Sequence, residues 1–295
     1  MPTHKPFAGM VSVPAGRFMM GSNDFYPEER PEHQSDVDTF SIDKFTVTNS
    51  SFASFVEDTG YVTTAEIALD PESAPGMPPE YFTAGSLVFT MTDGPVRLTD
   101  FRNWWKFVAG AGWRNPEGPD SSIDDLGNYP VVQISLIDAL AYCDWAGKSL
   151  PTEREWEYAA RGGVDTVYPW GDKLVPDGII RANTWQGEFP WQISKIDEYA
   201  GAAPVNTYQP NGYGTFNMIG NVWEWTTDTY ADRHKTTKSC CTPKREYLEG
   251  RIMVVKGGSF LCAPSYCERY RRTARSPQEA RSSTNHLGFR CVVRG

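Results

Sequence analysis

Residues 257–272 read Gly-Gly-Ser-Phe-Leu-Cys-Ala-Pro-Ser-Tyr-Cys-Glu-Arg-Tyr-Arg-Arg, a stretch that holds Cys262 and Cys267 with four residues between them. Two thiolates at this spacing can converge on one soft metal ion if the intervening residues turn the chain. A thiolate pair favours copper(I), whereas zinc usually takes four ligands. The additional cysteines nearby are the adjacent Cys240 and Cys241, so a structural zinc site is a strained alternative.

Four arginines follow the pair closely: Arg269, Arg271, Arg272 and Arg275. We expect their positive charge to lower the pKa of both thiols and to favour the nucleophilic, metal-binding thiolate. Lone cysteine pairs are also common as disulfides or as buried thiols. The spacing alone therefore supports a soft-metal site and a disulfide about equally.

Length and charge limit the class of protein. The 295 residues fit one large domain or two small ones, and the net charge of -9 argues against nucleic acid as the main partner. No apolar run is long enough for a signal peptide, and none reaches the ~20 residues of a membrane span. We expect a cytoplasmic protein that does not bind membranes.

The pattern along the chain predicts few helices and many short strands. Strands are expected within 10–21, around a Pro-Ala-Gly turn, within 40–47, and later at Arg251 to Val255. Three helices are expected, beginning at Thr48 or Asn49, Ser135 and Thr152, and ending at Gly60, Gly147 and Gly162-Gly163. Residues 65 to 130 are expected to form ordered loops packed by Trp104, Trp105 and Trp113. One compact α+β domain over 1–295 with little regular secondary structure is the simplest account.

The stretch 257–272 resembles the signature of formylglycine-generating enzymes, the sulfatase-modifying factor family. The resemblance extends to Leu150–Glu157, Ala182–Gly187, Gly220–Trp225 and Leu287–Cys291, and so covers nearly the whole chain. It implies a fold related to C-type lectins. Most of these motifs mark a broader superfamily that includes lectin-like binding modules and iron-dependent sulfoxide synthases, and the two cysteines are the discriminating element. The synthases bind iron through a histidine-rich helical domain, whereas the histidines here, His4, His33, His234 and His286, never stand at ligand spacing.

The resemblance implies a copper-dependent oxidase. Cys262 and Cys267 would hold copper(I), and the substrate would be a cysteine within Cys-x-Pro-x-Arg of an unfolded or nascent sulfatase, converted to formylglycine with oxygen and a thiol reductant. Ser259, Trp223, Tyr266 and Arg269 match positions that line this site in the family, and Ser259 can hydrogen-bond near the reacting sulfur and oxygen. Outside such a motif these residues would be assigned to core packing and an ion pair. We expect a monomer.

The resemblance also implies two calcium sites that tie loops together. The first is matched by Asn183, Thr184, Asp197 and Tyr199, although Trp191 to Lys195 depart from the usual pattern. The second is matched by Asn217, Gly220, Val222 and Glu224, with Gly220 and Val222 contributing carbonyl oxygens. Amide, carbonyl and carboxylate oxygens are the ligands that calcium prefers. From the residues alone, Val222 to Trp225 would be assigned to a buried strand.

The remaining cysteines have weaker assignments. Cys143 and Cys291 match positions that are disulfide-linked in secreted relatives, and the partners of a second such disulfide are replaced by Ala159 or Ala160 and Thr273. In a reducing cytoplasm the first pair can stay as two buried thiols. Residues 241–245 read Cys-Thr-Pro-Lys-Arg and fit the substrate motif, a match short enough that a surface loop remains the favoured interpretation.

Overall fold

The structure, a computed structural model, describes residues 8–72, 75–194, 199–234, 248 and 250–295. Within them the strands are β1 Met10–Val13, β2 Gly16–Met20, β3 His33–Val37, β4 Phe40–Asp43, β5 Gly85–Phe89, β6 Trp105–Ala109, β7 Trp223–Thr229, β8 Ile252–Lys256, β9 Arg275–Glu279, β10 Leu287–Gly288 and β11 Val292–Arg294. The α-helices are α1 Asn49–Thr59, α2 Leu136–Trp145 and α3 Glu153–Arg161. Short 3-10 turns are η1 Pro27–Glu29, η2 Thr64–Glu66, η3 Pro79–Phe82, η4 Phe101–Asn103 and η5 Pro176–Gly178.

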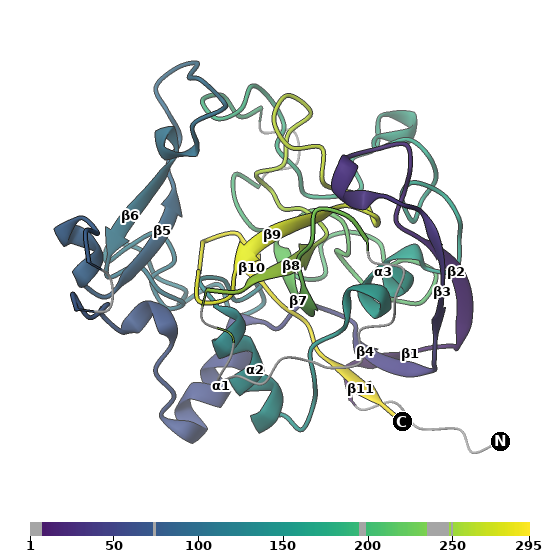
Figure 1. Ribbon diagram of the computed structural model, residues 1–295, viewed down its shortest axis with the longest axis horizontal. Helices are drawn as coiled ribbons and strands as arrows, with labels where there is room; N and C mark the ends of the chain where they lie inside the picture. The colour runs from purple at the N-terminus through teal and green to yellow at the C-terminus, as the bar shows by residue number, and fades with distance from the viewer. Residues whose placement is uncertain (1–7, 73–74, 195–198, 235–247, 249) are drawn as a thin grey trace.

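A central sheet with the strand order β10-β7-β8-β9 is flanked by smaller sheets (Figure 1). The β7, β8 and β9 strands pair antiparallel, and the short β10 pairs parallel with the start of β7. A second sheet, β1-β4-β11, joins the first strand to the last, so both ends of the described chain are tied into one element. Hairpins β2-β3 and β5-β6 lie on opposite sides of the centre (Figure 1).

All three α-helices begin where the side-chain caps predict. Thr48, Ser135 and Thr152 each accept a hydrogen bond from the backbone N–H three residues on, and the latter two complete capping boxes with Asp138 and Glu155. α1 and α3 end at Gly60 and Gly162, both in the left-handed conformation. The α2 helix ends at Trp145, two residues before the expected Gly147, with Ala146 as cap and Gly147 in the left-handed conformation.

Two expectations were wrong in extent. The strand from residue 40 ends at Asp43, because the chain bends at Lys44 and Phe45 and the Val47 N–H then bonds to Phe289 rather than to a sheet neighbour. Residues 65–130 are not loops alone, since β5 and β6 form a regular five-residue ladder. Trp104 and Trp113 are buried as expected, whereas Trp105 is only partly buried.

The stretch 257–274 is the long connection between the paired strands β8 and β9. Gly257 and Gly258 begin it with φ values of 96° and 77°, a region that side chains other than glycine rarely adopt. A Cβ on Gly258 would lie 2.8 Å from the Arg269 carbonyl oxygen, so the returning half of the connection packs directly on this turn. The two ends of the cysteine segment are thereby held against each other.

A cluster of buried charges joins α3 to the central sheet. Lys256, fully buried at the end of β8, lies 3.0 Å from Glu157 and 3.4 Å from Glu153. Arg275, at the start of β9, donates two hydrogen bonds to Glu153 at 2.8 and 2.9 Å. Burial alone would raise the pKa of Glu153, but Lys256 and Arg275 outweigh it and lower that pKa to about 2. The carboxylate is therefore ionised over the physiological range.

Replacing Glu153 with glutamine should lower the free energy of unfolding by roughly 3–5 kcal/mol at pH 7, because Lys256 and Arg275 would lose a buried carboxylate. Since folding lowers the pKa of Glu153, this difference between wild type and variant is complete above its ordinary value of 4.5 and shrinks as the pH falls towards 2. Urea unfolding between pH 3 and pH 7 measures it. Asp36→Asn, which breaks the exposed pair with Arg17, should have no measurable effect, and an equal loss in both variants would contradict the assignment.

Candidate functional site

The two cysteines of the β8–β9 connection face each other, with 3.1 Å between their sulfur atoms, and neither is in a disulfide. Cys262 is 2% exposed, whereas Cys267 is partly accessible. The turn that brings them together is held by the N–H groups of Tyr266 and Cys267, which both donate to the Ala263 carbonyl. The structure therefore brings the predicted pair together as one buried and one accessible thiol.

The two thiols differ in acidity. A hydrogen bond from Cys262 and the neighbouring Arg269 lower the pKa of Cys267 to about 7. Burial instead raises the pKa of Cys262 well above its ordinary value, as does the adjacent Cys267. The expectation that the arginines would lower both values is thus confirmed for Cys267 and wrong for Cys262. In the metal-free pair, Cys267 is therefore the thiol that loses its proton first.

Of the four arginines, Arg269 has the main effect on the pair. Arg269 is the charge that lowers the pKa of Cys267, and it is itself bonded to Glu28. The other three bind carboxylates elsewhere: Arg271 pairs with Glu29, Arg272 with Asp165 and Arg275 with Glu153.

Ser259 lies beside Cys262 as predicted. Its backbone N–H donates to the Cys262 sulfur at 3.4 Å, and its hydroxyl lies 3.0 Å from Nδ1 of His286. Desolvation lowers the pKa of His286 to about 3, so the ring is neutral and can either donate to or accept from the hydroxyl. The His286 ring also packs edge-on against Trp105 at 4.9 Å.

Trp223 and His286 are set side by side by the sheet. Trp223 begins β7, and its N–H donates to the His286 carbonyl at 2.8 Å, just where β10 pairs with β7. Trp223 is 5% exposed and belongs to the same hydrophobic cluster as Cys262. The structure thus places Trp223 next to His286, in the same hydrophobic core as the buried thiol.

Tyr266 forms the accessible side of the site. It is 38% exposed, stacks on Phe189 at 4.6 Å and meets the Trp104 ring edge-on at 5.1 Å. Burial of its inner part raises the pKa of Tyr266 to about 12, so its hydroxyl keeps the proton. An aromatic wall of Trp104, Phe189 and Tyr266 therefore stands beside the accessible Cys267.

The donor set fits a soft, low-coordinate metal ion. Two sulfur atoms converge, and among the described residues no group of three or more His, Cys, Asp and Glu side chains could hold a metal. A thiolate pair without further ligands fits copper(I) better than zinc, which would need two more. Cys240 and Cys241 lie outside the described residues.

The second predicted calcium site shows one oxygen that lacks a partner. The amide nitrogen of Asn217 donates to the Val205 carbonyl at 3.2 Å, whereas its buried Oδ1 has no hydrogen-bond partner. Glu224 accepts two hydrogen bonds from Arg290 and one from Trp156, which leaves one lone-pair direction on Oε1. Both residues thus retain an oxygen that a calcium ion can use.

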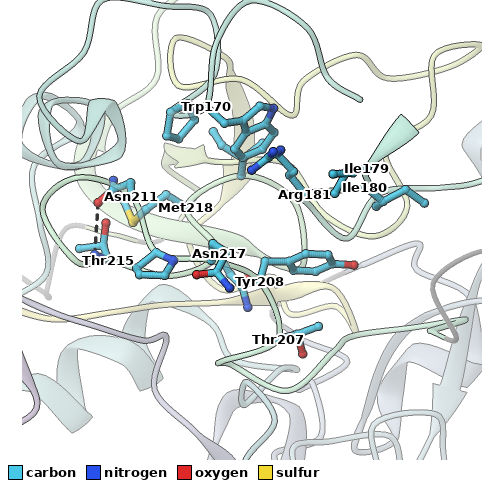
Figure 2. A pocket seen from close by; sticks show the side chains of 14 residues that line it. Trp170, Ile179, Ile180, Arg181, Thr207, Tyr208, Asn211, Thr215, Asn217 and Met218 are labelled. Carbon is cyan, nitrogen blue, oxygen red and sulfur yellow. Dashed lines mark hydrogen bonds between the residues drawn. The ribbon is translucent and has the colours of Figure 1, made fainter. Parts of the chain in front are cut away.

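Asn217 also lines a pocket of about 230 Å³ that contains neither Cys262 nor Cys267 (Figure 2). Its walls include the rings of Trp170 and Tyr208 and the guanidinium of Arg181. The pocket is therefore separate from the thiol pair, and it borders the second predicted calcium site through Asn217.

The first predicted calcium site is described only in part. The amide nitrogen of Asn183 donates to Gly201 and Asn221, and Thr184 and Tyr199 belong to the described residues. Asp197 lies outside them.

The other cysteine pair, Cys143 and Cys291, is buried, with 3.5 Å between the two sulfur atoms and no disulfide.

Sequence reasoning missed three residues that contact the side chains around the thiol pair: His286 bonds to Ser259, Phe189 stacks on Tyr266, and Glu28 bonds to Arg269. His286 directly precedes the Leu287–Cys291 motif, a position that could have marked it. Phe189 and Glu28 carry no such signal, because they come from segments far from 257–272 in the chain.

Comparisons with known proteins identify the family of the chain. A family model described as "Sulfatase-modifying factor enzyme 1-like domain" matches residues 1–295. The formylglycine-generating enzyme of Mycobacterium tuberculosis is 49% identical over 96% of this chain and 97% of its own. A bovine relative named "Inactive C-alpha-formylglycine-generating enzyme 2" is 38% identical over 96% of this chain and 87% of its own.

A solved structure, that of PvdO from Pseudomonas aeruginosa, has a TM-score of 0.65 at 23% identity and covers 96% of this chain and 93% of that one. This likeness concerns the fold alone, and it confirms the α+β fold with little regular secondary structure. Because the family model matches residues 1–295 and a relative is 49% identical over 96% of the chain, the protein belongs to the sulfatase-modifying factor family, alongside the formylglycine-generating enzymes.

Proposed function

We propose that this protein is a copper-dependent oxidase that converts the cysteine of a Cys-x-Pro-x-Arg segment in sulfatases to formylglycine. The observation that carries the proposal is the pairing of the accessible Cys267 with the buried Cys262 beside Ser259 and an aromatic wall. Three relatives named formylglycine-generating enzyme are 46–49% identical to this chain, whereas a relative named as inactive is 38% identical.

The reaction requires a two-electron reductant besides oxygen. The substrate carbon loses a C–H and its C–S bond and gains a C=O bond. The sulfur leaves as sulfide, and the second oxygen atom is reduced to water with two electrons and two protons from two thiol groups of the reductant, which become a disulfide. A bound copper(I) ion would supply the binding of the substrate thiolate and the activation of oxygen.

The residues of this chain have distinct roles around that chemistry. Cys262 and Cys267 hold the metal as thiolates, and Arg269 balances their negative charge. The Ser259 hydroxyl, oriented by His286, can hold or pass a proton next to the Cys262 sulfur. Trp223 shields the buried thiol from water, and Tyr266 with Phe189 offers the substrate segment an apolar wall.

Cys267→Ser should abolish copper(I) binding and reduce aldehyde formation to background, because one thiolate cannot replace the pair. The assay combines protein, copper(I), a thiol reductant, oxygen and a Cys-x-Pro-x-Arg peptide, and detects the aldehyde by mass. Cys143→Ser, which removes a buried thiol of the other pair, is the matched control and should keep both properties. Absence of aldehyde with copper-loaded wild type would favour a non-catalytic, lectin-like binding module.

We also propose that Asn217, Gly220, Val222 and Glu224 bind a calcium ion that stabilises the loop before β7, and that Asn183, Thr184, Asp197 and Tyr199 bind another. The support for the site at Asn217 is the buried Oδ1 of its side chain, which has no hydrogen-bond partner. Asn217 has a φ of 50°, which glycine also adopts freely.

Calcium at about 100 times its dissociation constant should raise the melting temperature of wild type by roughly 5–10 °C, since such saturation contributes about 2.7 kcal/mol. Asn217→Gly removes the side-chain oxygen without straining the backbone and should lose most of this rise. Scanning calorimetry with calcium or with a chelator measures the effect. A full calcium response in Asn217→Gly would rule out this ligand set.

A further inference from the structure

Arg269, the arginine beside Cys267, is held by a segment from the other end of the chain. The clamp segment, Phe25–Glu29, lies across 268–275 although about 240 residues separate them in sequence. Glu28 accepts hydrogen bonds from Nε and Nη2 of Arg269, at 3.0 and 2.5 Å. The Tyr26 ring lies 4.0 Å from the Arg269 guanidinium carbon, and its hydroxyl accepts the Glu268 N–H.

Alternate residues of the connection meet the clamp segment. Beyond Arg269, the guanidinium of Arg271 lies 3.9 Å over Phe25 and bonds to Glu29 at 2.6 Å. Glu29 also accepts a hydrogen bond from Thr273 at 2.6 Å. The side chain of Glu29 thus secures the connection at two residues, whereas the side chain of Glu28 bonds to Arg269, the arginine that lowers the pKa of Cys267. The Glu28 carbonyl, which a glutamine at this position would keep, accepts a hydrogen bond from Arg275 at 3.2 Å.

The two glutamates differ in burial as well. Glu29 is 0% exposed and its partner Arg271 is 3% exposed, which is typical of a structural ion pair. The side chains of Glu28 and Arg269 keep 12% and 25% of their area accessible, so this pair lies at the edge of the thiol site. Its two hydrogen bonds and one ring contact fix both the position and the tilt of the guanidinium.

We propose that Glu28 is a positioning residue for the Cys262–Cys267 metal site, acting through Arg269, with Tyr26 supporting the same guanidinium from its face. This inference rests on the proposed function, in which the pair binds copper(I). Two thiolates and one copper(I) ion carry a net negative charge, and a fixed guanidinium beside Cys267 balances it.

A positioning role and a simple charge effect predict opposite results. If Glu28 acted only by its charge, its removal would strengthen copper(I) binding, because a negative charge would be lost near two thiolates. If Glu28 holds Arg269 in place, its removal lets the guanidinium move away from Cys267, and copper(I) binds more weakly. The sign of the change therefore distinguishes the two.

The test measures the copper(I) dissociation constant of the whole protein by competition with a chromophoric copper(I) chelator. Glu28→Gln should weaken binding about five-fold, as expected for loss of a partly buried charged hydrogen-bond pair. Arg269→Met should weaken it further. In the Arg269→Met background, Glu28→Gln should cause no additional change, because the effect of Glu28 passes through Arg269.

Glu29→Gln is the matched control in the same segment. It should lower the midpoint of urea unfolding while leaving the copper(I) dissociation constant unchanged, because Arg271 does not act on Cys267. Equal weakening in Glu28→Gln and Glu29→Gln would show that general loosening of the segment is responsible and would overturn the inference. Unchanged or tighter binding in Glu28→Gln would also overturn it, whereas failure of wild type to bind copper(I) would reject the proposed function itself.

Discussion

The turn at Gly257 and Gly258 is the constraint on which the site depends. Its left-handed backbone takes the chain out of β8 and leaves room for the Arg269 carbonyl to pack where a side chain would otherwise stand. The connection to β9 can therefore fold back on itself and bring Cys262 and Cys267 together. A bulkier residue at Gly258 would push apart the two halves of the segment that carries both thiols.

Around this turn, buried ion pairs connect neighbouring elements of the fold. Glu153, Glu157, Lys256 and Arg275 join α3 to β8 and β9, and Glu29 with Arg271 joins the N-terminal segment to the same connection. Removing one partner of such a buried pair leaves an uncompensated charge, which is costly. The network gives the cysteine segment a fixed orientation even though it has no helix or strand of its own.

Several features of the fold and site could be read directly from the sequence. The caps at Thr48, Ser135 and Thr152 are local hydrogen bonds between residues three apart, so their helices were predicted closely. The hairpin of β5 and β6 was missed, because the fifteen residues between its strands contain no short turn that would link them. Likewise, the sequence could not show which of the two thiols has the lower pKa, because that depends on which one is buried in the core.

The sequence by itself determined the family, the helix starts and the residue types of the thiol site, because motifs and caps depend on neighbours along the chain. Only the tertiary structure decided which arginine faces the thiols, that His286 orients Ser259, and that Glu28 holds Arg269. Ion pairs and hydrogen bonds over more than 200 residues of sequence accompany the packing of the β2-β3 hairpin on α3 and of α3 on the central sheet. That packing depends on the complementary shapes of distant segments, which no local pattern specifies.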